Sequence, residues 1–430
     1  MKRNSKRLLI TVIIAAVVVL IPIGYAFYYY TTNYSIDLIG DKEVKLNLNG
    51  VYEEQGATAV VKGKVSTNKI KITGKVNTAK PGKYTIKYSV SSITAKRIVT
   101  VGKKMNPEIK LKDNKKITMK LGEKLKNNSY TATDEDGNDL TDKVKVDTSA
   151  IKKAGKGEVS YTVTDSKGNT TRVYRQVTVK ANTDYNTPGL PICMFHYVYD
   201  ENDPPEDLYK RYGNYISAQA LEKELKWLKS ENYYFPTWDE VRDYVDGKLI
   251  LPDKSIVITF DDGTKNFMEL GIPVLEKCKV PATSFVITKN KGEEKVKKYA
   301  SKYVTFESHS HNMHRPGGTI GHGGIFTALS KEDALADLKK STDIVDNSDA
   351  FAYPYGDYND QCEEILKEAG FKCAVTTQPG KVKPGDDPYL LPRQRMSLGQ
   401  SLEQFQSKVK PGSSIVSTPT DKNGTAITSN

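Results

Sequence analysis

Two adjacent carboxylates close the run Ser255-Ile-Val-Ile-Thr-Phe-Asp-Asp-Gly263. An apolar, β-branched strand leads directly into Asp261 and Asp262, and the end of a strand at a loop is a common place for a functional site. Because adjacent side chains on an extended chain diverge, one acid can hold a metal while the other accepts a proton. The alternative is a plain strand end, since Asp and Gly also favour turns.

Three of the five histidines stand in a second run, Phe306-Glu-Ser-His-Ser-His-Asn-Met-His314. One carboxylate and two imidazoles, with open positions left over, suit a divalent metal such as Zn²⁺. Asp262, His309 and His314 form the best trio. His311 is the rival for one place, because it shares a strand face with His309, whereas His314 needs a turn to reach the metal. Histidines merely hydrogen-bonded at a strand end are the metal-free alternative.

The second half of the chain alternates strand and helix, which predicts a parallel sheet and, in a domain of this size, a barrel. Ser217, Thr237 and Ser330 stand where helix N-caps belong. Strands are expected at 191–198, 255–261, 283–287, 304–308, 350–353 and 372–376, and helices at 217–231, 237–245, 265–278, 331–345 and 360–369. In barrels the site gathers at the carboxyl ends of strands. The residues that fall at such ends are His196, Asp261, Asp262, His309, His314 and Tyr355.

The order of these runs resembles the polysaccharide deacetylase family (the NodB homology domain, carbohydrate esterase family 4). Thr259 to Gly263 matches the TFDDG motif in full, and Phe351-Ala-Tyr-Pro-Tyr-Gly-Asp-Tyr-Asn359 matches the Pro-Tyr turn. The five-residue step from His309 to His314 and the opening strand Pro191–Tyr197, with its Phe-His, are most similar to the branch that deacetylates poly-N-acetylglucosamine. The resemblance covers about residues 190 to 413 and implies a distorted (β/α) barrel of seven or eight strands.

The resemblance also implies roles for the residues that match. Asp262, His309 and His314 would hold the metal, and Asp261 would be the general base for water attacking an acetamide carbonyl. The backbone N–H of Tyr355 is the expected second donor to the oxyanion.

Two positions depart from the family pattern. Many members take the general acid from a late histidine, but no histidine follows His322 here. In the branch that this chain most resembles, the acid comes from the first strand, so His196 is the candidate, with a buried core histidine as the alternative. The second departure is Ala352, which replaces an arginine that orients the catalytic Asp; Arg393 or Arg395 could supply the guanidinium instead. His322 lies in a glycine-rich loop, Pro316 to Gly324, which is a surface loop by default.

The first 30 residues predict a membrane anchor. Basic residues in 1–7 precede an apolar stretch at 8–30 that is long enough to span a bilayer as a helix. The basic flank predicts a cytoplasmic tail, so everything after the helix is expected outside the cell. A cleaved signal peptide, and hence a secreted protein, is the alternative.

An internal repeat fills the segment between the anchor and the barrel. Gly82–Val90 realigns on Gly155–Val163 at a constant offset of 73. Alternating strands bounded by turns predict two small β-sandwiches, at 35–102 and 106–180, similar to bacterial immunoglobulin-like modules. A linker at 181–190, the barrel at 191–413 and a tail at 414–430 complete the expected order. We expect the sandwiches to act as a spacer, with glycan or wall binding as the alternative.

The composition limits the classes of molecule that are expected to bind this protein. The formal net charge is +12, but there is no basic helix and no aromatic-basic platform, so nucleic acid is excluded as a partner. A basic ectodomain instead favours anionic envelope polymers, or is simply soluble. Cys193, Cys278, Cys362 and Cys373 have no CxxC spacing, and we expect buried thiols rather than a Cys362–Cys373 disulfide.

The leading function is therefore a membrane-anchored, metal-dependent deacetylase of N-acetylglucosamine polysaccharides, either exopolysaccharide or peptidoglycan. An O-acetyl esterase acting on xylan and a non-catalytic glycan-binding surface protein are the alternatives. No feature of the sequence indicates a protein partner.

Overall fold

The computed structural model describes residues 34–46, 52–62, 64–102, 107–112, 116–125, 129–134 and 136–412. The predicted cytoplasmic tail at 1–7, the predicted membrane helix at 8–30 and the predicted tail at 414–430 therefore lie outside the described residues. No helix within the described ranges is both long and apolar enough to cross a membrane. Contacts divide the chain into two compact units, the second of which comprises Thr118–Lys124, Ile151–Lys156 and everything from Thr178 onward.

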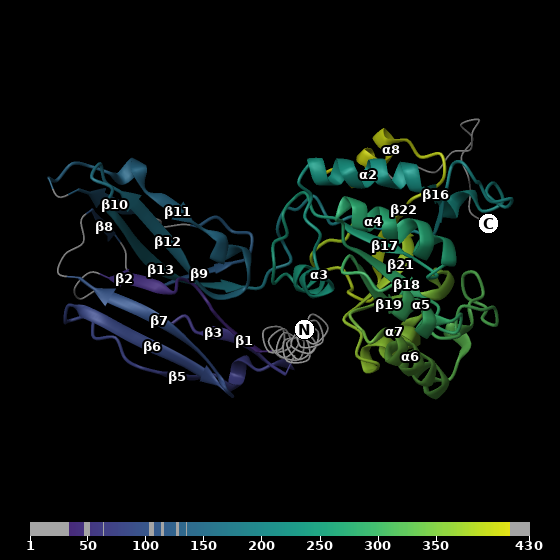
Figure 1. Cartoon of the computed structure of the whole chain (residues 1–430), viewed down its shortest axis with the longest axis horizontal. Coiled ribbons are helices and arrows are strands. Elements are labelled where there is room, and N and C mark those ends of the chain that lie inside the picture. Colours follow the sequence, from purple (N-terminus) through teal and green to yellow (C-terminus); the bar gives the residue numbers. More distant parts are fainter. Residues whose placement is uncertain are drawn as a thin grey trace, which may run out of the picture. The chain divides into compact units, whose positions relative to one another are not determined.

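The first unit contains most of the two predicted β-sandwiches (Figure 1). Most of β9 and the ends of β12 and β13 are grouped with the second unit. In the first sandwich a sheet of order β2-β7-β6-β5 packs on a sheet of order β1-β3-β4. The second sandwich pairs β11-β12-β13-β9 with β10-β8. The bounds in the first sandwich are β1 Tyr34–Leu38, β2 Glu43–Leu46, β3 Ala57–Val61, β4 Lys64–Val65, β5 Lys71–Thr73, β6 Gly82–Val90 and β7 Ile93–Val101. Those in the second are β8 Glu108–Leu111, β9 Ile117–Lys120, β10 Tyr130–Thr133, β11 Lys145–Asp147, β12 Gly155–Thr164 and β13 Thr170–Lys180.

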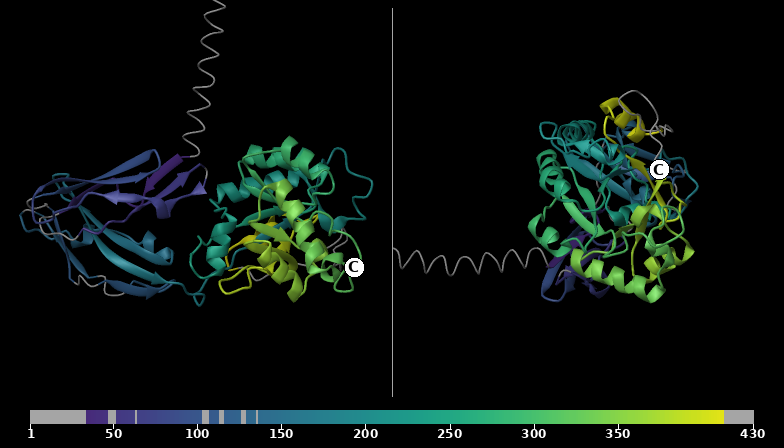
Figure 2. Two further views of the ribbon diagram at one scale, coloured as in Figure 1. Left: turned by 90° about the horizontal axis from the view of Figure 1, so that it is seen from below. Right: turned by 90° about the vertical axis from the view of Figure 1, so that its right-hand side faces the viewer.

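The second unit contains a closed, parallel barrel of order β14-β17-β18-β19-β20-β21-β22, with helices around it (Figures 1 and 2). This is the seven-stranded form of the predicted barrel. Its strands are β14 Ile192–Phe195, β17 Val257–Phe260, β18 Ala282–Val286, β19 Val304–Ser308, β20 Ala350–Ala352, β21 Cys373–Pro379 and β22 Leu391–Arg395. The helices are α2 Ala218–Ser230, α3 Trp238–Val245, α4 Ile272–Cys278, α5 Gly292–Lys298, α6 Lys331–Val345, α7 Asp360–Glu368 and α8 Leu402–Val409.

Most of these helices and strands lie where helix caps and sequence periodicity predict them. Ser217, Thr237 and Ser330 cap α2, α3 and α6 with their side-chain oxygens, as their positions predict. The predicted helix at 265–278 is in fact a π-turn, Phe267–Gly271, followed by α4. Helices α5 and α8 and the strands β22 and β16 (Tyr215–Ser217) were not predicted, because each is short. The predicted strand at 191–198 covers β14 and the first two residues of β15 (Tyr197–Tyr199), which pairs in parallel with β16.

The barrel core fixes the end of β17. All residues of β17 are buried, and Phe260 stacks on Phe195 of β14 and on Phe267. These aromatic contacts anchor the last residue before the two aspartates, so the carboxylates emerge at a rigid rim. The cysteines are free thiols, three of them buried, in agreement with the expectation.

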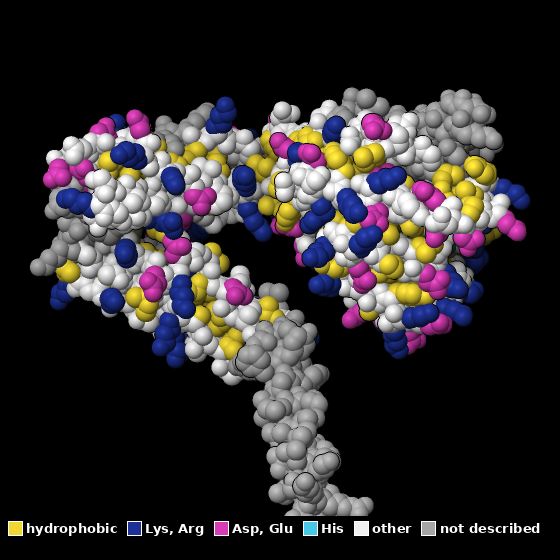
Figure 3. Space-filling view, turned by 45° about the horizontal axis from the view of Figure 1, so that its top comes forward, with side chains coloured by type: hydrophobic (Ala, Val, Ile, Leu, Met, Phe, Trp, Pro, Cys, Tyr) yellow, Lys and Arg dark blue, Asp and Glu magenta, His cyan; other side chains and the backbone are white. Residues whose placement is uncertain are grey.

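Charged side chains are spread over the surface. Figure 3 shows Lys and Arg side chains scattered across the visible face of both units, with acidic side chains between them.

Candidate active site

Asp261 and Asp262 separate at a left-handed turn. Asp262 has φ 70° and Gly263 has φ 58°, a region that costs a residue with a Cβ some strain. A Cβ on Gly263 would lie 2.9 Å from Cγ1 of Val286, so only glycine fits there. The turn sends the two carboxylates in different directions, which gives each its own set of partners.

Asp262, His309 and His314 converge on one point. Nε2 of His309 lies 3.5 Å from Oδ1 of Asp262, and Nε2 of His314 lies 3.6 Å from the same oxygen. One ligand atom from each of the three residues lies within 4.8 Å of the others. Nδ1 of His309 is 2.7 Å from the carbonyl oxygen of Ala352, which makes Nδ1 the protonated nitrogen and leaves Nε2 as a free ligand. The donor set therefore fits a divalent metal.

The electrostatics of this trio suit a cation. Burial acts to raise the pKa of Asp262, but the neighbouring histidines, His309 first among them, hold it well below its usual range. Burial and the nearby His309 lower the pKa of His314 to about 4. His314 is thus a neutral imidazole at pH 7, which is the form that coordinates a metal.

His311 points elsewhere. Ser310 adopts φ 67°, and this turn takes His311 away from the face of His309. Its Nδ1 lies 3.0 Å from Oγ1 of Thr288, and its backbone N–H donates to Oδ1 of Asp337 at 2.7 Å. The strand-face argument for His311 as a rival ligand therefore fails, because β19 ends at Ser308, before the three histidines.

Asp261 is held by a buried arginine. Arg393 on β22 donates from both terminal nitrogens to the two carboxylate oxygens of Asp261, at 2.7 Å each. Burial acts to raise the pKa of Asp261, but the charge and hydrogen bonds of Arg393 lower it below its usual value. Of the two candidates to replace the arginine missing at Ala352, Arg393 is the one that reaches Asp261. Arg395 donates to Oδ1 of Asn214 at 2.6 Å.

His196 is a second close neighbour of Asp261, besides Arg393. It follows β14 directly, and its Nε2 is 3.9 Å from Oδ2 of Asp261. Within the described residues its Nδ1 is buried and has no hydrogen-bond partner. Burial, the largest influence, lowers the pKa of His196 despite the two aspartates. A buried imidazole with one nitrogen unsatisfied and the other facing a carboxylate is poorly explained by packing alone.

The Pro-Tyr turn brings Tyr355 to the same rim. Tyr355 has φ 61°, and its ring packs on His314 with centroids 4.4 Å apart. The buried Asp357 accepts the backbone N–H groups of His322 and Gly324, both at 2.8 Å, and so ties the glycine-rich loop to this turn. The His322 side chain itself is exposed.

Tyr197 and Arg211 also reach the site, although neither was predicted. The hydroxyl of Tyr197 donates to Oδ2 of Asp262 at 3.4 Å, and Arg211 donates to that hydroxyl at 2.7 Å. The sequence offered one indication of Tyr197, which is that it directly follows the predicted site residue His196. Arg211 lies in a long loop whose path the sequence does not reveal.

The ligand set makes a direct prediction about metal content. Asp262→Ala and His314→Ala should each empty the site, because each removes a direct ligand, whereas His311→Ala should leave it filled. Metal analysis of the purified variants after dialysis checks this. His311→Ala is the matched control, since it deletes a histidine of the same segment that faces Thr288. Loss of metal from His311→Ala, with retention in His314→Ala, would overturn the ligand choice.

Comparisons with known proteins indicate the family of this chain. Residues 248–374 match the polysaccharide deacetylase family, and residues 36–101 and 109–179 match the bacterial surface protein Ig-like domain. A poly-β-1,6-N-acetyl-D-glucosamine N-deacetylase of Staphylococcus aureus is 32% identical over 202 residues, which cover 43% of this chain and 69% of that protein. The protein of the same description from Staphylococcus epidermidis is 32% identical over 203 residues, with the same coverage. Among solved structures, a Streptococcus pyogenes deacetylase in complex with acetate superimposes with a TM-score of 0.46 at 24% identity, over 52% of this chain and 99% of that one.

Proposed function

Because this chain belongs to the polysaccharide deacetylase family, whose members hydrolyse carbon–nitrogen bonds, we propose that it removes N-acetyl groups from a β-linked N-acetylglucosamine polymer with the help of a divalent metal, Zn²⁺ first among the candidates. The likeness to the staphylococcal N-deacetylases supports the substrate class. The convergence of Asp262, His309 and His314 is the observation that carries the metal dependence.

Each of these residues has a different catalytic role at the scissile amide. A metal held by the trio would polarise the acetyl oxygen and lower the pKa of a water molecule. Asp261, kept ionised by Arg393, accepts the proton of the attacking water. The backbone N–H of Tyr355 donates to the developing oxyanion, and the left-handed turn fixes its direction in advance.

His196 supplies the proton to the leaving amine in this scheme. Its Nε2 faces Oδ2 of Asp261, so the proton that Asp261 accepts from water lies next to the group that must deliver it. Expulsion of an amine requires this protonation, whereas a phenolate leaves without it.

The role of His196 predicts a substrate-dependent defect. His196→Ala should slow deacetylation of the acetamide substrate about a hundredfold or more, but slow cleavage of an aryl acetate far less. Both rates, measured on the same enzyme preparation with its metal content checked, decide the question. The matched control is His311→Ala, which removes an imidazole that contacts Thr288 rather than Asp261. Equal losses on both substrates would mean that His196 is structural.

The substrate proposal is tested by acetate release. The enzyme should release acetate from β-1,6-linked N-acetylglucosamine oligomers and stop when a chelator removes the metal. Chito-oligosaccharide, peptidoglycan and acetylxylan complete the panel. Faster turnover of acetylxylan would favour an O-acetyl esterase, and binding without acetate release would favour a glycan-binding protein.

We also propose that residues 8–30 anchor the enzyme in the cell membrane, with the barrel outside. The length and flanking charge of that segment support this. Fractionation of cells should find the full-length chain in the membrane, and external protease should digest it in intact protoplasts. A shortened chain in the culture medium would instead indicate a cleaved signal peptide.

A further inference from the structure

The outer face of one sheet in the first sandwich is rich in lysine. The strands β2, β7, β6 and β5 lie side by side in this sheet. Residues such as Ile86, Tyr88 and Val99 are buried on its inner face, so the alternate residues point to solvent. We call this outer surface the lysine face. Its exposed lysines are Lys45, Lys71, Lys83, Lys87 and Lys96.

These lysines are not neutralised within the protein. Among the described residues, none of them lies within ion-pair distance of a carboxylate, although many other lysines of the chain do. Lys87 and Lys96 stand directly opposite each other on β6 and β7. Like charges in that position destabilise a sheet. The opposed lysines therefore lower the stability of the sheet, and no ion pair among the described residues offsets that loss.

The second sandwich shows that the fold does not need these lysines. The repeat places Ser160 of β12 where the first copy has Lys87, and Tyr174 of β13 where it has Lys96. Glu158 stands at the position of Thr85. The same sheet forms in both copies, so the pair of opposed lysines is not a requirement of the sandwich.

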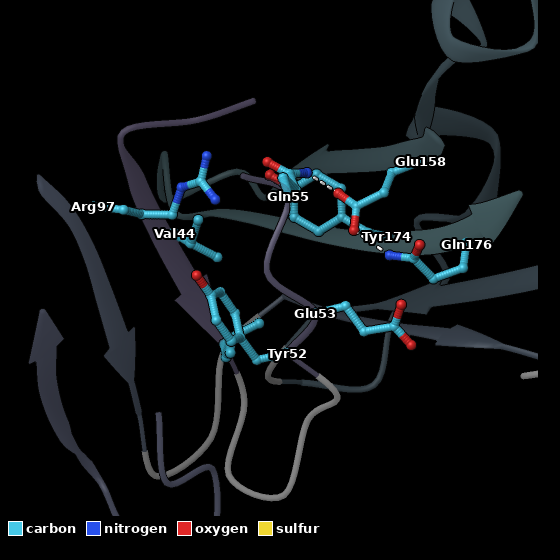
Figure 4. Close-up of a pocket in the computed structure, with 9 residues that line it drawn as sticks. Val44, Tyr52, Glu53, Gln55, Arg97, Glu158, Tyr174 and Gln176 are labelled. Carbon is cyan, nitrogen blue, oxygen red and sulfur yellow. Dashed lines mark hydrogen bonds between the residues drawn. The ribbon is translucent and has the colours of Figure 1, made fainter. Parts of the chain in front are cut away.

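In the second sandwich this equivalent face has a partner, which is the first sandwich itself. Tyr174 donates its hydroxyl to Asp41 at 2.7 Å, and Arg172 pairs with the same carboxylate at 2.7 Å. Gln55 also donates to Glu158. Figure 4 shows the hollow along this seam, with Tyr174 and Glu158 on one side and Arg97 and Tyr52 on the other. In the second sandwich this face packs against the first sandwich. In the first sandwich the equivalent face is exposed to solvent and carries lysines.

From this contrast we propose that the lysine face binds a linear polyanion outside the cell, a phosphodiester polymer of the poly(glycerol phosphate) type. A flat sheet suits an extended chain lying across it. Lys83 and Lys87 are four residues apart on one strand, roughly 13 Å, while Lys87 and Lys96 are neighbours across strands. The lysines thus form a two-dimensional array of positive points rather than a single pocket.

The polar residues of the face favour phosphate. Thr85, Thr94, Ser89 and Thr100 lie between the lysines and offer hydroxyl donors to phosphate oxygens. Apart from Glu43, the charged side chains at the outward positions of these four strands are lysines, which bind phosphate as point charges. There is also no outward aromatic ring on which a neutral sugar could stack.

The test measures binding of a synthetic glycerol phosphate oligomer to the full chain. The informative variant is Lys87→Ser with Lys96→Tyr, because those residues occupy the equivalent positions of the second sandwich. The matched control is Lys69→Gln with Lys80→Gln, which removes the same charge from exposed positions of the same sandwich, one at the end of a short 3-10 helix and one in a turn. A neutral N-acetylglucosamine oligomer, anionic lipid vesicles and duplex DNA are the comparison ligands.

We expect the double variant of the lysine face to lose about tenfold or more in affinity for the oligomer, and the loop control to lose less than about threefold. Binding should weaken with added salt, since exposed charges are screened. Turnover of a short soluble acetylated oligomer should be unchanged in both variants. Equal losses in both variants, no binding of the oligomer, or tighter binding to vesicles or DNA would each overturn the proposal.

Discussion

Asp261→Asn should lower kcat for deacetylation about a hundredfold or more while leaving the metal bound. The exchange removes the proton acceptor and keeps its shape, and a positioned general base typically contributes at least that much. Asp262, His309 and His314 are untouched, so the ligand set remains complete. Steady-state rates and metal analysis on the same preparation check both halves of this expectation.

Asp343→Asn is a suitable control for that experiment. Asp343 is exposed on α6, and its ion pair among the described residues is with Lys339 at 2.8 Å. The same chemical change there should leave kcat within about twofold, since exposed pairs contribute little. If Asp261→Asn keeps a near-normal rate with metal bound, the base lies elsewhere and the assignment is wrong.

Arg393→Met should damage both stability and turnover. Arg393 and Asp261 are both buried and bind each other through two hydrogen bonds. Removal of one partner leaves an uncompensated buried charge, which costs about 3–5 kcal/mol and corresponds to roughly 6–20 °C in Tm for a domain of this size. The Asp261 carboxylate also loses the cation that keeps it ionised, so kcat should fall as well. Thermal unfolding and steady-state kinetics measure the two effects.

A double variant separates the pair from packing. Asp261→Asn with Arg393→Met removes both charges, so it should be more stable than Arg393→Met alone. Arg395→Met, on the same strand but bound to Asn214, should cost less stability than Arg393→Met. A single Arg393→Met variant as stable as the wild type would show that the buried pair does not hold the site together.

The sequence was sufficient for the features that depend on local patterns. The caps at Ser217, Thr237 and Ser330 and the strand at Val304–Ser308 follow from residue type and periodicity. The strand that leads into Asp261 was also predictable from its run of apolar, β-branched residues. The repeat of Gly82–Val90 at Gly155–Val163 likewise indicated two copies of one sandwich, because similar sequences form similar sheets.

The sequence could also narrow the site, because parallel strands of a barrel bring their carboxyl ends to one rim. That rule placed His196, Asp261, His309 and Tyr355 together before any distance was known. It could not choose between Arg393 and Arg395, or exclude His311, since those choices depend on which way each side chain points.

Tertiary structure decided these choices through contacts between distant residues and through unusual backbone angles. Arg393 reaches Asp261 across 132 residues of sequence, and only the closure of β22 on β14 brings their strands together. The left-handed turns at Asp262, Ser310 and Tyr355 bring the Asp262 carboxylate to His309 and His314, move His311 aside and set the direction of the Tyr355 backbone N–H. Such angles are rare for Ser and Tyr and only tolerated by Asp, so local preference alone does not predict them, and the surrounding packing must hold them in place.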